Sequence, residues 1–439
     1  MKYAVFFAAL LFGVPIMAWG AKTSERIRGW LVTMMIAIIG FGKVGSINFV
    51  SMENYRGPDR GFEVTLTDLI CLALIWMMVS QYRDRIVWVP FNSLWLLALW
   101  LFACISVTQA MDPLVALFSV WKWARAYMVY WTVVNVFRTP FPRIAVWRAF
   151  VIMGIYITLI ALKQKYVDHI YRIPGPFDHS NTVPLFLNQF LPVMAIWGLT
   201  DKKLSNGQAA MTLIAALGLC VASQSTFSRL GSSLSLLGFL SALVVANFRE
   251  RTPRVRVTTV LAVIAVVVGA MLALPSIIAR INSAPEESEE ARKEFNQAAK
   301  LMSQDYLFGV GVNNFPRVLT KVGRYNQFVS VMEDEEEAGV CHHIYYLTAA
   351  ELGRGGLVVF AIILIRFLWR NAWGILKGGK DLKTTLLYGF LVGACALHTS
   401  GFAEWVFRIT PVTYMFAICA GMMVAFSEPP KKERKAVAA

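Results

Sequence analysis

The chain has 439 residues, of which 57% are hydrophobic and only 16% are charged, and its mean hydropathy is +0.56. Because a chain this apolar cannot cover itself as an ordinary soluble domain, we interpret it as an all-α polytopic membrane protein. Its formal net charge of +15 does not indicate a nucleic-acid binder, since the basic residues fall in short runs between apolar stretches, as cytoplasmic loops do. The six cysteines show neither a disulfide framework nor the spacing of zinc ligands.

Apolar stretches follow one another along most of the chain. A helix needs about 20 apolar residues to cross the hydrocarbon of a bilayer, and about thirteen stretches (range roughly 11–14) meet that requirement. The first is interpreted as a retained helix because it lacks a convincing signal-peptide cleavage site. The expected spans are 3–20, 30–49, 65–81, 92–109, 114–137, 144–163, 182–199, 208–224, 229–247, 257–276, 343–368, 384–402 and 411–427.

The loops between these stretches predict an orientation. Alternate short loops carry the basic residues and are expected to be cytoplasmic, which places the other set outside. The outer set includes 51–64, 164–181, 225–228, 277–341 and 403–410. We therefore divide the chain into an N-terminal transmembrane bundle (1–276), an outward loop (277–341), C-terminal transmembrane helices (343–427) and a basic cytoplasmic tail (428–439).

The outward loop at 277–341 is the only long polar segment of the sequence. Its residues 291–303 predict an amphipathic helix, with Phe295, Ala298, Ala299 and Met302 on one side at helical spacing. Two acidic runs, at 286–290 and 333–337, are interpreted as solvated. Adjacent carboxylates do not show the convergence in space that a metal site needs, so no metal site is expected.

The stretch from Cys341 to Gly356 returns the chain from this polar loop to apolar sequence. Within this stretch His342 and His343 stand just before the first apolar residue, and Tyr345 follows closely. Imidazoles at the mouth of a buried helix can act as neutral bases toward a substrate that arrives from water. They can equally be interfacial anchors.

Several arginines and one lysine are candidates for binding an anion. Arg229 follows a polar turn and opens a span, where its planar guanidinium suits a phosphate, although a snorkelling arginine fits the same position. Arg292 and Arg280 lie in the outward loop and could add a second positive group. Lys122 and Arg125 fall inside the 114–137 span, where an unpaired charge is costly; they predict a partner, a polar cavity or a later helix start.

Three further polar positions admit two interpretations. Asn181 precedes a span and could bind substrate or cap the helix. His398 and Glu404 flank a short outward turn and could be structural hydrogen-bonding residues or site residues. At about 100° per residue Glu351 lies opposite His342 on their helix, so we expect it to pair with Arg354, one turn on.

Four patches of sequence carry a resemblance to a known family. Arg172-Ile-Pro-Gly-Pro-Phe-Asp-His-Ser-Asn181 is similar to a Gly-x-Phe-x-x-x-Asn pattern before a span, and Ser228-Arg229-Leu230-Gly231 to a Ser-Arg-Gly turn with one inserted residue. Arg292 to Ala299 with Tyr306-Leu-Phe-Gly-Val-Gly resembles a loop helix followed by Pro-Leu-Phe-Gly-Val-Gly. His342 to Gly356 resembles His-Asn-x-Tyr-Leu-x-x-x-x-Glu-x-Gly-x-x-Gly, with His343 where Asn is usual. In this order the patches resemble the O-antigen ligase and polymerase family of bacterial envelope glycosyltransferases.

The resemblance implies a reaction and a location. A glycan would pass from undecaprenyl diphosphate to a hydroxyl of an acceptor glycan, lipid A-core or other acceptor, on the periplasmic side of the bacterial inner membrane. Arg229, Arg292 and Arg280 would hold the diphosphate, and His342 or His343 would accept the hydroxyl proton. Attack opposite the diphosphate would invert the anomeric centre. Fixed positive charge makes a divalent metal unnecessary, and no cofactor is expected.

Other functions remain open from the sequence. A multi-span transporter of small anions could use the same arginines, although no duplicated halves are visible. A non-catalytic subunit of an export complex is a further alternative. Within the family, lipopolysaccharide O-antigen ligase and O-antigen or exopolysaccharide polymerase share a donor and differ in the acceptor, so the sequence does not separate them, and protein O-glycosylation is a third acceptor class.

Overall fold

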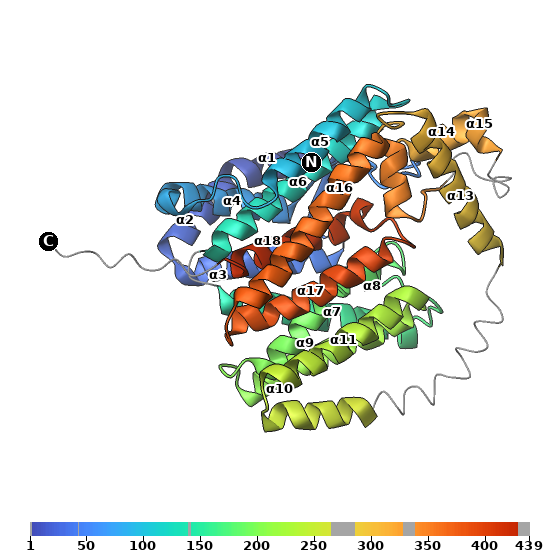
Figure 1. The fold of residues 1–439 in the computed structure, drawn as a ribbon. Coiled ribbons are helices and arrows are strands. Elements are labelled where there is room, and N and C mark those ends of the chain that lie inside the picture. The colour runs from blue at the N-terminus through green and yellow to red at the C-terminus, as the bar shows by residue number, and fades with distance from the viewer. Residues whose placement is uncertain (1, 43, 139–141, 265–285, 328–338, 429–439) are drawn as a thin grey trace.

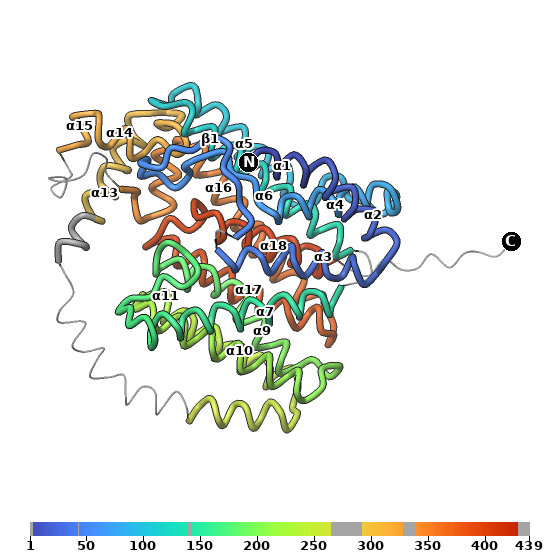
Figure 2. The backbone as a smooth tube through the Cα atoms, turned by 180° about the vertical axis from the view of Figure 1, so that it is seen from behind, coloured from blue at the N-terminus to red at the C-terminus, as the bar shows by residue number. Residues whose placement is uncertain are grey.

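The computed structural model of the chain describes residues 2–42, 44–138, 142–264, 286–327 and 339–428. The described residues are mostly helical and contain one small two-stranded sheet. The helices form a bundle with α16 running along one face, and α13 to α15 lie together at one end of it (Figure 1). Seen from behind, β1 lies at that same end (Figure 2).

The helices begin and end as follows. The N-terminal half contains α1 (Lys2–Ala8), the π-helix η1 (Ala9–Gly13), α2 (Val14–Thr23), α3 (Glu25–Ala37), α4 (Leu66–Gln81), α5 (Ser93–Val107), α6 (Pro113–Arg138), α7 (Arg143–Leu162), α8 (Thr182–Leu187), α9 (Leu191–Thr200), α10 (Asn206–Ser225) and α11 (Arg229–Arg249). Residues 253–264 are also helical. The C-terminal part contains α13 (Glu286–Asp305), α14 (Phe315–Lys321), α15 (Gly323–Asn326), α16 (Ile344–Lys377), α17 (Leu382–Ser400) and α18 (Thr410–Phe426).

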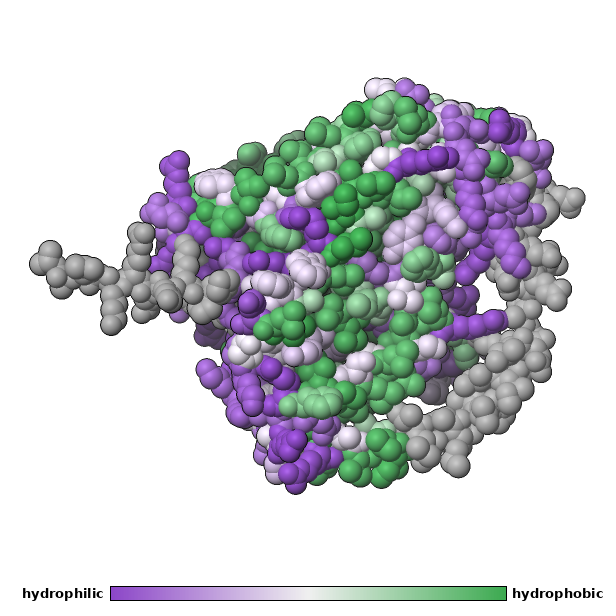
Figure 3. Space-filling view, in the orientation of Figure 1, coloured by the Kyte–Doolittle hydropathy of each residue, from purple (hydrophilic) through white to green (hydrophobic). Residues whose placement is uncertain are grey.

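Apolar helices dominate the bundle. Five described helical segments are long and apolar enough to cross a membrane: Tyr3–Thr23, Arg143–Val167, Asn206–Ser225, Arg229–Arg249 and Ile344–Lys377. Four apolar helices of 10–17 residues accompany them: Leu66–Gln81, Ser93–Val107, Leu191–Thr200 and Thr410–Phe426. Hydrophobic residues spread across the middle of the face in Figure 3, and hydrophilic residues gather on both sides of it, at the end that carries α13 to α15 and along the left-hand side. These features are compatible with a helical membrane protein.

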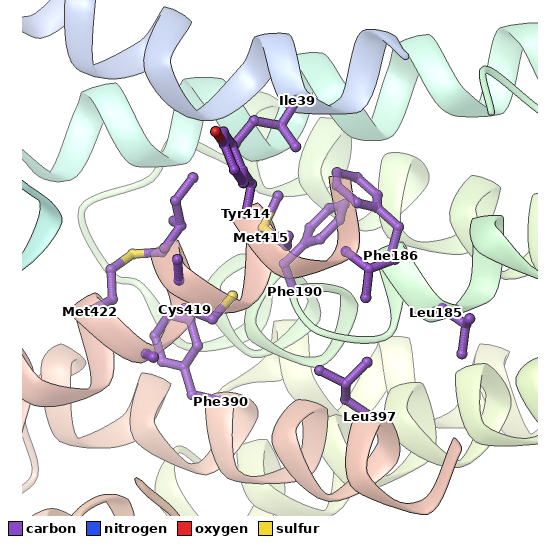
Figure 4. Packing of buried hydrophobic residues seen from close by; sticks show 14 of the residues in the cluster. Ile39, Leu185, Phe186, Phe190, Phe390, Leu397, Tyr414, Met415, Cys419 and Met422 are labelled. Carbon is purple, nitrogen blue, oxygen red and sulfur yellow. The ribbon is translucent and has the colours of Figure 1, made fainter. Parts of the chain in front are cut away.

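The core is packed around α18. Its residues Tyr414, Met415, Cys419 and Met422 are buried, and they lie among side chains from the short 3-10 helix η2 (Ile38–Phe41), from α8 and from α17 (Figure 4). Phe186 and Phe190 fill the space beside Met415 from the α8 side. Because burial of each large apolar side chain contributes about 1.5–3 kcal/mol, this layer fixes the segment that precedes α18, which lines the candidate site.

The expected span at 30–49 is wrong in its second half. Helix α3 ends at Ala37 and passes into a short 3-10 helix, η2 (Ile38–Phe41), after which β1 (Ser46–Ser51) pairs antiparallel with β2 (Gly61–Thr65). Gly42 and Gly45 lie between them with φ of 74° and 77°, a region that L side chains rarely adopt. A Cβ on Gly42 would also stand 2.1 Å from the Pro176 carbonyl oxygen. Glycine therefore ends the helix and turns the chain into a hairpin.

The expected span at 182–199 is interrupted. Helix α8 ends at Leu187 and α9 begins at Leu191. Pro192 stands in the first turn of α9, where it has no N–H to donate to the carbonyl of Asn188 and its ring would clash there in a continuous helix. The two amide side chains at the break bind backbone carbonyls of other segments. Asn188 donates to the Gly231 carbonyl at 3.1 Å, and Gln189 donates to the Val412 carbonyl at 3.2 Å.

Helix α16 is kinked at Gly353, where φ is 72° and ψ is 175°. Gly353, Gly355 and Gly356 would let another span pack closely here. Instead, the turn at 307–311 packs on Gly353, because a Cβ there would lie 2.0 Å from the Leu307 carbonyl oxygen. The backbone N–H of Val310 donates to the Ala350 carbonyl at 2.8 Å. This carbonyl would bond to the N–H of Arg354 in a continuous helix, so the turn provides the hydrogen bond that the kink removes. Only Gly355 approaches a span, through Phe102 of α5.

The amphipathic helix expected at 291–303 is confirmed as part of α13, which buries Ala298, Ala299 and Met302 and packs against α16. Other predictions fall where the structure is silent. Arg280, the second half of the expected 257–276 span and the acidic run at 333–337 lie outside the described residues.

Candidate functional site

A cavity of ≈ 760 Å³ opens at the end of the bundle that carries α13 and the hairpin. Its walls come from η2, the β-hairpin with the loop that joins its strands, α6, the loop at 172–182, α13 and the segment at 404–414. The candidate residues among its lining are Lys122, Arg125, Asn181, Arg292 and His342. The fold therefore brings together side chains that are up to 220 residues apart in the chain.

His342 faces this cavity and contacts a carboxylate. Its Nδ1 lies 3.2 Å from Oε2 of Glu404, and its side chain is 31% exposed. His342 directly precedes α16 and Glu404 follows α17, and these two helix ends are in contact, since the N–H of Ile344 donates to the Gly401 carbonyl at 2.9 Å. With Nδ1 turned to Glu404, the other ring nitrogen of His342 is free to contact a bound molecule.

His343 has a different role. Its Nδ1 accepts a hydrogen bond from the N–H of Tyr346 at 3.3 Å, so the ring caps the start of α16. The same ring stacks on Tyr346 with centroids 3.9 Å apart. Burial lowers the pKa of His343, and the nearby Lys300 adds to this effect, which keeps the ring in the neutral form that a cap requires. The geometry therefore separates the two histidines that the sequence left equivalent.

Glu404 is the centre of a group that we call the histidine cluster: Arg172, Asn181, Arg292, His342 and Glu404. Besides His342, Glu404 accepts a hydrogen bond from Nδ2 of Asn181 at 2.6 Å, and Nη2 of Arg292 lies 3.4 Å from it. Asn181 in turn accepts a hydrogen bond from Arg172 through its side-chain oxygen. The amide thus links the carboxylate to a second guanidinium, and it does not cap α8 with its side chain.

Two arginines of this cluster line the cavity. Arg292 extends from α13, and its side chain is 38% exposed. Arg172 is held by a hydrogen bond from its Nε to the Thr226 carbonyl at 3.0 Å. Arg229, the arginine that the sequence favoured, is an exposed residue that opens α11 three positions after Thr226, and it does not line the cavity. Of these two arginines, Arg172 and not Arg229 lines the cavity.

Lys122 and Arg125 lie deeper and are already paired. Lys122 Nζ is 2.5 Å from Asp59 Oδ1 and donates to the Arg408 carbonyl at 2.6 Å. Arg125 pairs with Asp68 at 2.8 Å. Of the explanations that the sequence left open, the structure supports a partner for both cations, whose side chains are only 2% and 4% exposed, and it also places both at the wall of the cavity. A later helix start is wrong, because α6 begins at Pro113.

Glu351 does not pair with Arg354, which corrects the prediction from the helical spacing. It lies 2.8 Å from Arg408, and both side chains are buried. Arg408 also stacks over Trp123 at 4.8 Å. We call the pairs Asp59–Lys122, Asp68–Arg125 and Glu351–Arg408 the buried ion-pair network. Tyr345, the remaining candidate, donates to the His398 carbonyl at 3.0 Å and does not line the cavity.

The sequence reasoning undervalued several of these residues. The sequence leaves Glu404 open between a structural role and a site role, gives Arg172 only as the first residue of a sequence patch, and does not single out Asp59, Asp68 or Arg408. A usable signal was present for Asp68, because a carboxylate inside an apolar stretch needs a partner as much as Lys122 does.

Comparison with known proteins adds no assignment, since the chain matches no protein-family model and no curated protein sequence. The resemblance to the O-antigen ligase and polymerase family therefore depends on the four sequence patches, and the function must be argued from the site.

Proposed function

We propose that the protein is an inverting, metal-independent membrane glycosyltransferase that transfers a glycan from undecaprenyl diphosphate to an acceptor hydroxyl. The observation that carries the proposal is the pairing of His342 with Glu404 at 3.2 Å in a cavity lined by Arg172 and Arg292. An oriented imidazole beside two guanidiniums supplies the two functions that such a transfer needs. The four sequence patches point to the same reaction.

The imidazole would act on the acceptor. With its Nδ1 proton directed to Glu404, His342 would hold a lone pair on Nε2 and accept the proton of the acceptor hydroxyl as the new glycosidic bond forms. Glu404 would keep the ring in this tautomer and stabilise the imidazolium. General-base help of this kind contributes about 10²–10⁴-fold to the rate.

The arginines would act on the donor. As the bond from the anomeric carbon to the diphosphate breaks, its electron pair stays on the leaving oxygen, and Arg292 and Arg172 would stabilise that charge with fixed donors. Attack from the face opposite the diphosphate inverts the anomeric centre. Arg229 would approach the lipid diphosphate from outside the cavity, beside the turn that Arg172 contacts.

The proposed setting is the bacterial inner membrane, with about thirteen spans and the cavity facing the periplasm. The hydrophilic end that carries α13 to α15 in Figure 3 would then be the periplasmic end. Undecaprenyl diphosphate would reach the cavity from the outer leaflet, and a glycan or lipid A-core acceptor would reach it from water.

The test uses the purified full-length protein and a labelled lipid-diphosphate oligosaccharide. Lengthening of the donor alone would identify a polymerase, whereas transfer only after lipid A-core or a protein is added would identify a ligase or a protein glycosyltransferase. Protein-free micelles are the control. If no glycan is transferred to any acceptor and proteoliposomes instead move a small anion across the bilayer, the transporter alternative replaces this proposal.

A further inference from the structure

Two arginines lie side by side on α16, far from the cavity. Arg366 and Arg370 are one helical turn apart, and both guanidiniums lie over the ring of Phe91, at 4.8 and 5.5 Å from its centroid. Like charges one turn apart repel each other. Their convergence on one aromatic ring therefore favours an anion that lies between them.

The protein supplies little to balance these charges. Arg366 donates through Nε to Asn92 Oδ1 at 2.7 Å, and Asn92 is itself held by a hydrogen bond to the Ile363 carbonyl at 3.1 Å. The Nε of Arg370 is buried and has no hydrogen-bond partner among the described residues. In the described part of the chain neither arginine forms an ion pair, and the carboxylate of Glu428 pairs with Arg138.

The position along α16 identifies the environment. Helix α16 folds back at Gly353, since the rings of Tyr345 and Phe360 lie 6.2 Å apart. Arg366 and Arg370 follow Gly353 by 13 and 17 residues, which at about 1.5 Å per residue places them roughly 20–25 Å along the helix from the turn at 307–311 that packs on Gly353. That is most of the hydrocarbon core of a bilayer, about 30 Å. Trp88, Trp369 and Trp373 are exposed near the two arginines, at 57%, 66% and 42%. Tryptophan is enriched where a membrane meets water.

We propose that Arg366 and Arg370 form a binding site for the phosphate group of an anionic phospholipid, at the end of the bundle opposite the cavity. The planar guanidinium fork matches phosphate oxygens, and Asn92 and Phe91 hold both forks in place. The exposed tryptophans would contact the glycerol and upper acyl region of the same lipid. The inference does not depend on the proposed glycosyl transfer.

The matched comparison is R366Q/R370Q against R251Q/R256Q. Both double variants remove two positive charges, and Arg251 and Arg256 are exposed near the end of α11. That end lies beside the end of α16, since Arg249 contacts the Gly379 carbonyl. The full-length protein would be purified and mixed with cardiolipin, phosphatidylglycerol or phosphatidylcholine, and bound lipid would be counted by native mass spectrometry.

We expect the wild type and R251Q/R256Q to retain an anionic lipid. R366Q/R370Q should bind this lipid with an affinity lower by about tenfold or more, as loss of a charge-assisted hydrogen bond predicts. Equal retention by all three proteins, or equal loss in both double variants, would overturn the site. A separate arm with inorganic phosphate tests the source: stabilisation by phosphate alone, equal to that by lipid, would overturn the lipid assignment.

A conservative variant covers the case in which R366Q/R370Q does not fold. R366K/R370K keeps both charges and loses the planar forks, so we expect it to fold and still to bind anionic lipid more weakly than the wild type. Unchanged binding by a folded R366K/R370K would reduce the site to general surface charge and contradict the proposal.

Discussion

The histidine cluster and the buried ion-pair network use the same residue types in opposite ways. In the network each cation meets a carboxylate at 2.5–2.8 Å, and the six side chains are 0–5% exposed. In the histidine cluster Glu404 meets His342 and Arg292 at 3.2 and 3.4 Å, and those two side chains are 31% and 38% exposed. Charges without access to water cannot change partners at low cost, whereas charges at a cavity wall can exchange a partner for a ligand. The comparison therefore favours a structural role for the network, and it supports the histidine cluster as the place of the proposed transfer.

The largest expected effect is on stability. Arg408→Met leaves the carboxylate of Glu351 buried without its partner, which should lower the free energy of unfolding by about 3–5 kcal/mol. E351M/R408M removes both charges and should recover much of that loss. The measurement is equilibrium unfolding in mixed detergent micelles.

The control for this prediction is Arg324→Met. Arg324 pairs with Asp305 at 3.2 Å, but its side chain is 62% exposed. An exposed pair contributes about 1 kcal/mol or less. A loss for Arg408→Met no larger than that for Arg324→Met would remove the distinction between the two regions.

The next effect is on catalysis. Glu404→Gln keeps the shape of the side chain and removes the charge that orients His342, so the transfer rate should fall by about 10²-fold or more. Because Glu404 acts through the base, kcat should carry the loss while KM for the acceptor changes little. Steady-state kinetics with varied acceptor measure this split. A rise in KM at constant kcat would make Glu404 a binding residue instead.

A smaller effect, on KM for the donor, should distinguish Arg172 from Arg229. Arg172→Gln removes a guanidinium from the cavity wall and should raise KM for the lipid-linked donor by about 10-fold, the value of a charge-assisted hydrogen bond. Arg229→Gln changes an exposed residue outside the lining and should alter KM by only about 2-fold. Donor titrations compare the two variants directly. The reverse order would favour the motif resemblance over the cavity as a guide to the diphosphate site.

The smallest effect concerns the helix cap. His343→Ala removes the acceptor for the Tyr346 N–H and should lower the free energy of unfolding by about 1 kcal/mol. His343→Asn supplies another capping side chain and should restore most of it. Thermal unfolding of the three proteins in one detergent checks the order. Equal stability of all three would remove the capping role from His343.

Local patterns in the sequence predicted much of the fold. The expected spans at 144–163, 208–224 and 229–247 end within two residues of α7, α10 and α11, because a continuous apolar stretch specifies a helix without help from distant residues. The expected spans are wrong where a glycine or a proline interrupts an apolar stretch. Gly42 and Pro192 end helices that hydropathy alone would continue.

The contacts of the site depend on tertiary structure, which sequence spacing does not reveal. Glu351 has Arg354 one turn away, yet it pairs with Arg408, 57 residues on, because the kink at Gly353 and the burial of both charges decide the partner. His342 and Glu404 meet across 62 residues through the contact between the ends of α16 and α17. The sequence did place His342, Arg292 and Asn181 among the candidates, since polar residues at the ends of apolar stretches are few.

The most direct test compares the two neighbouring histidines. Single-turnover transfer from a labelled lipid-diphosphate glycan would be measured for His342→Ala and His343→Ala, together with the unfolding temperature of each preparation. The account predicts that His342→Ala slows transfer by about 10²–10⁴-fold at unchanged stability, while His343→Ala loses stability and keeps its rate. Normal transfer by His342→Ala, or a loss confined to His343→Ala, would contradict it.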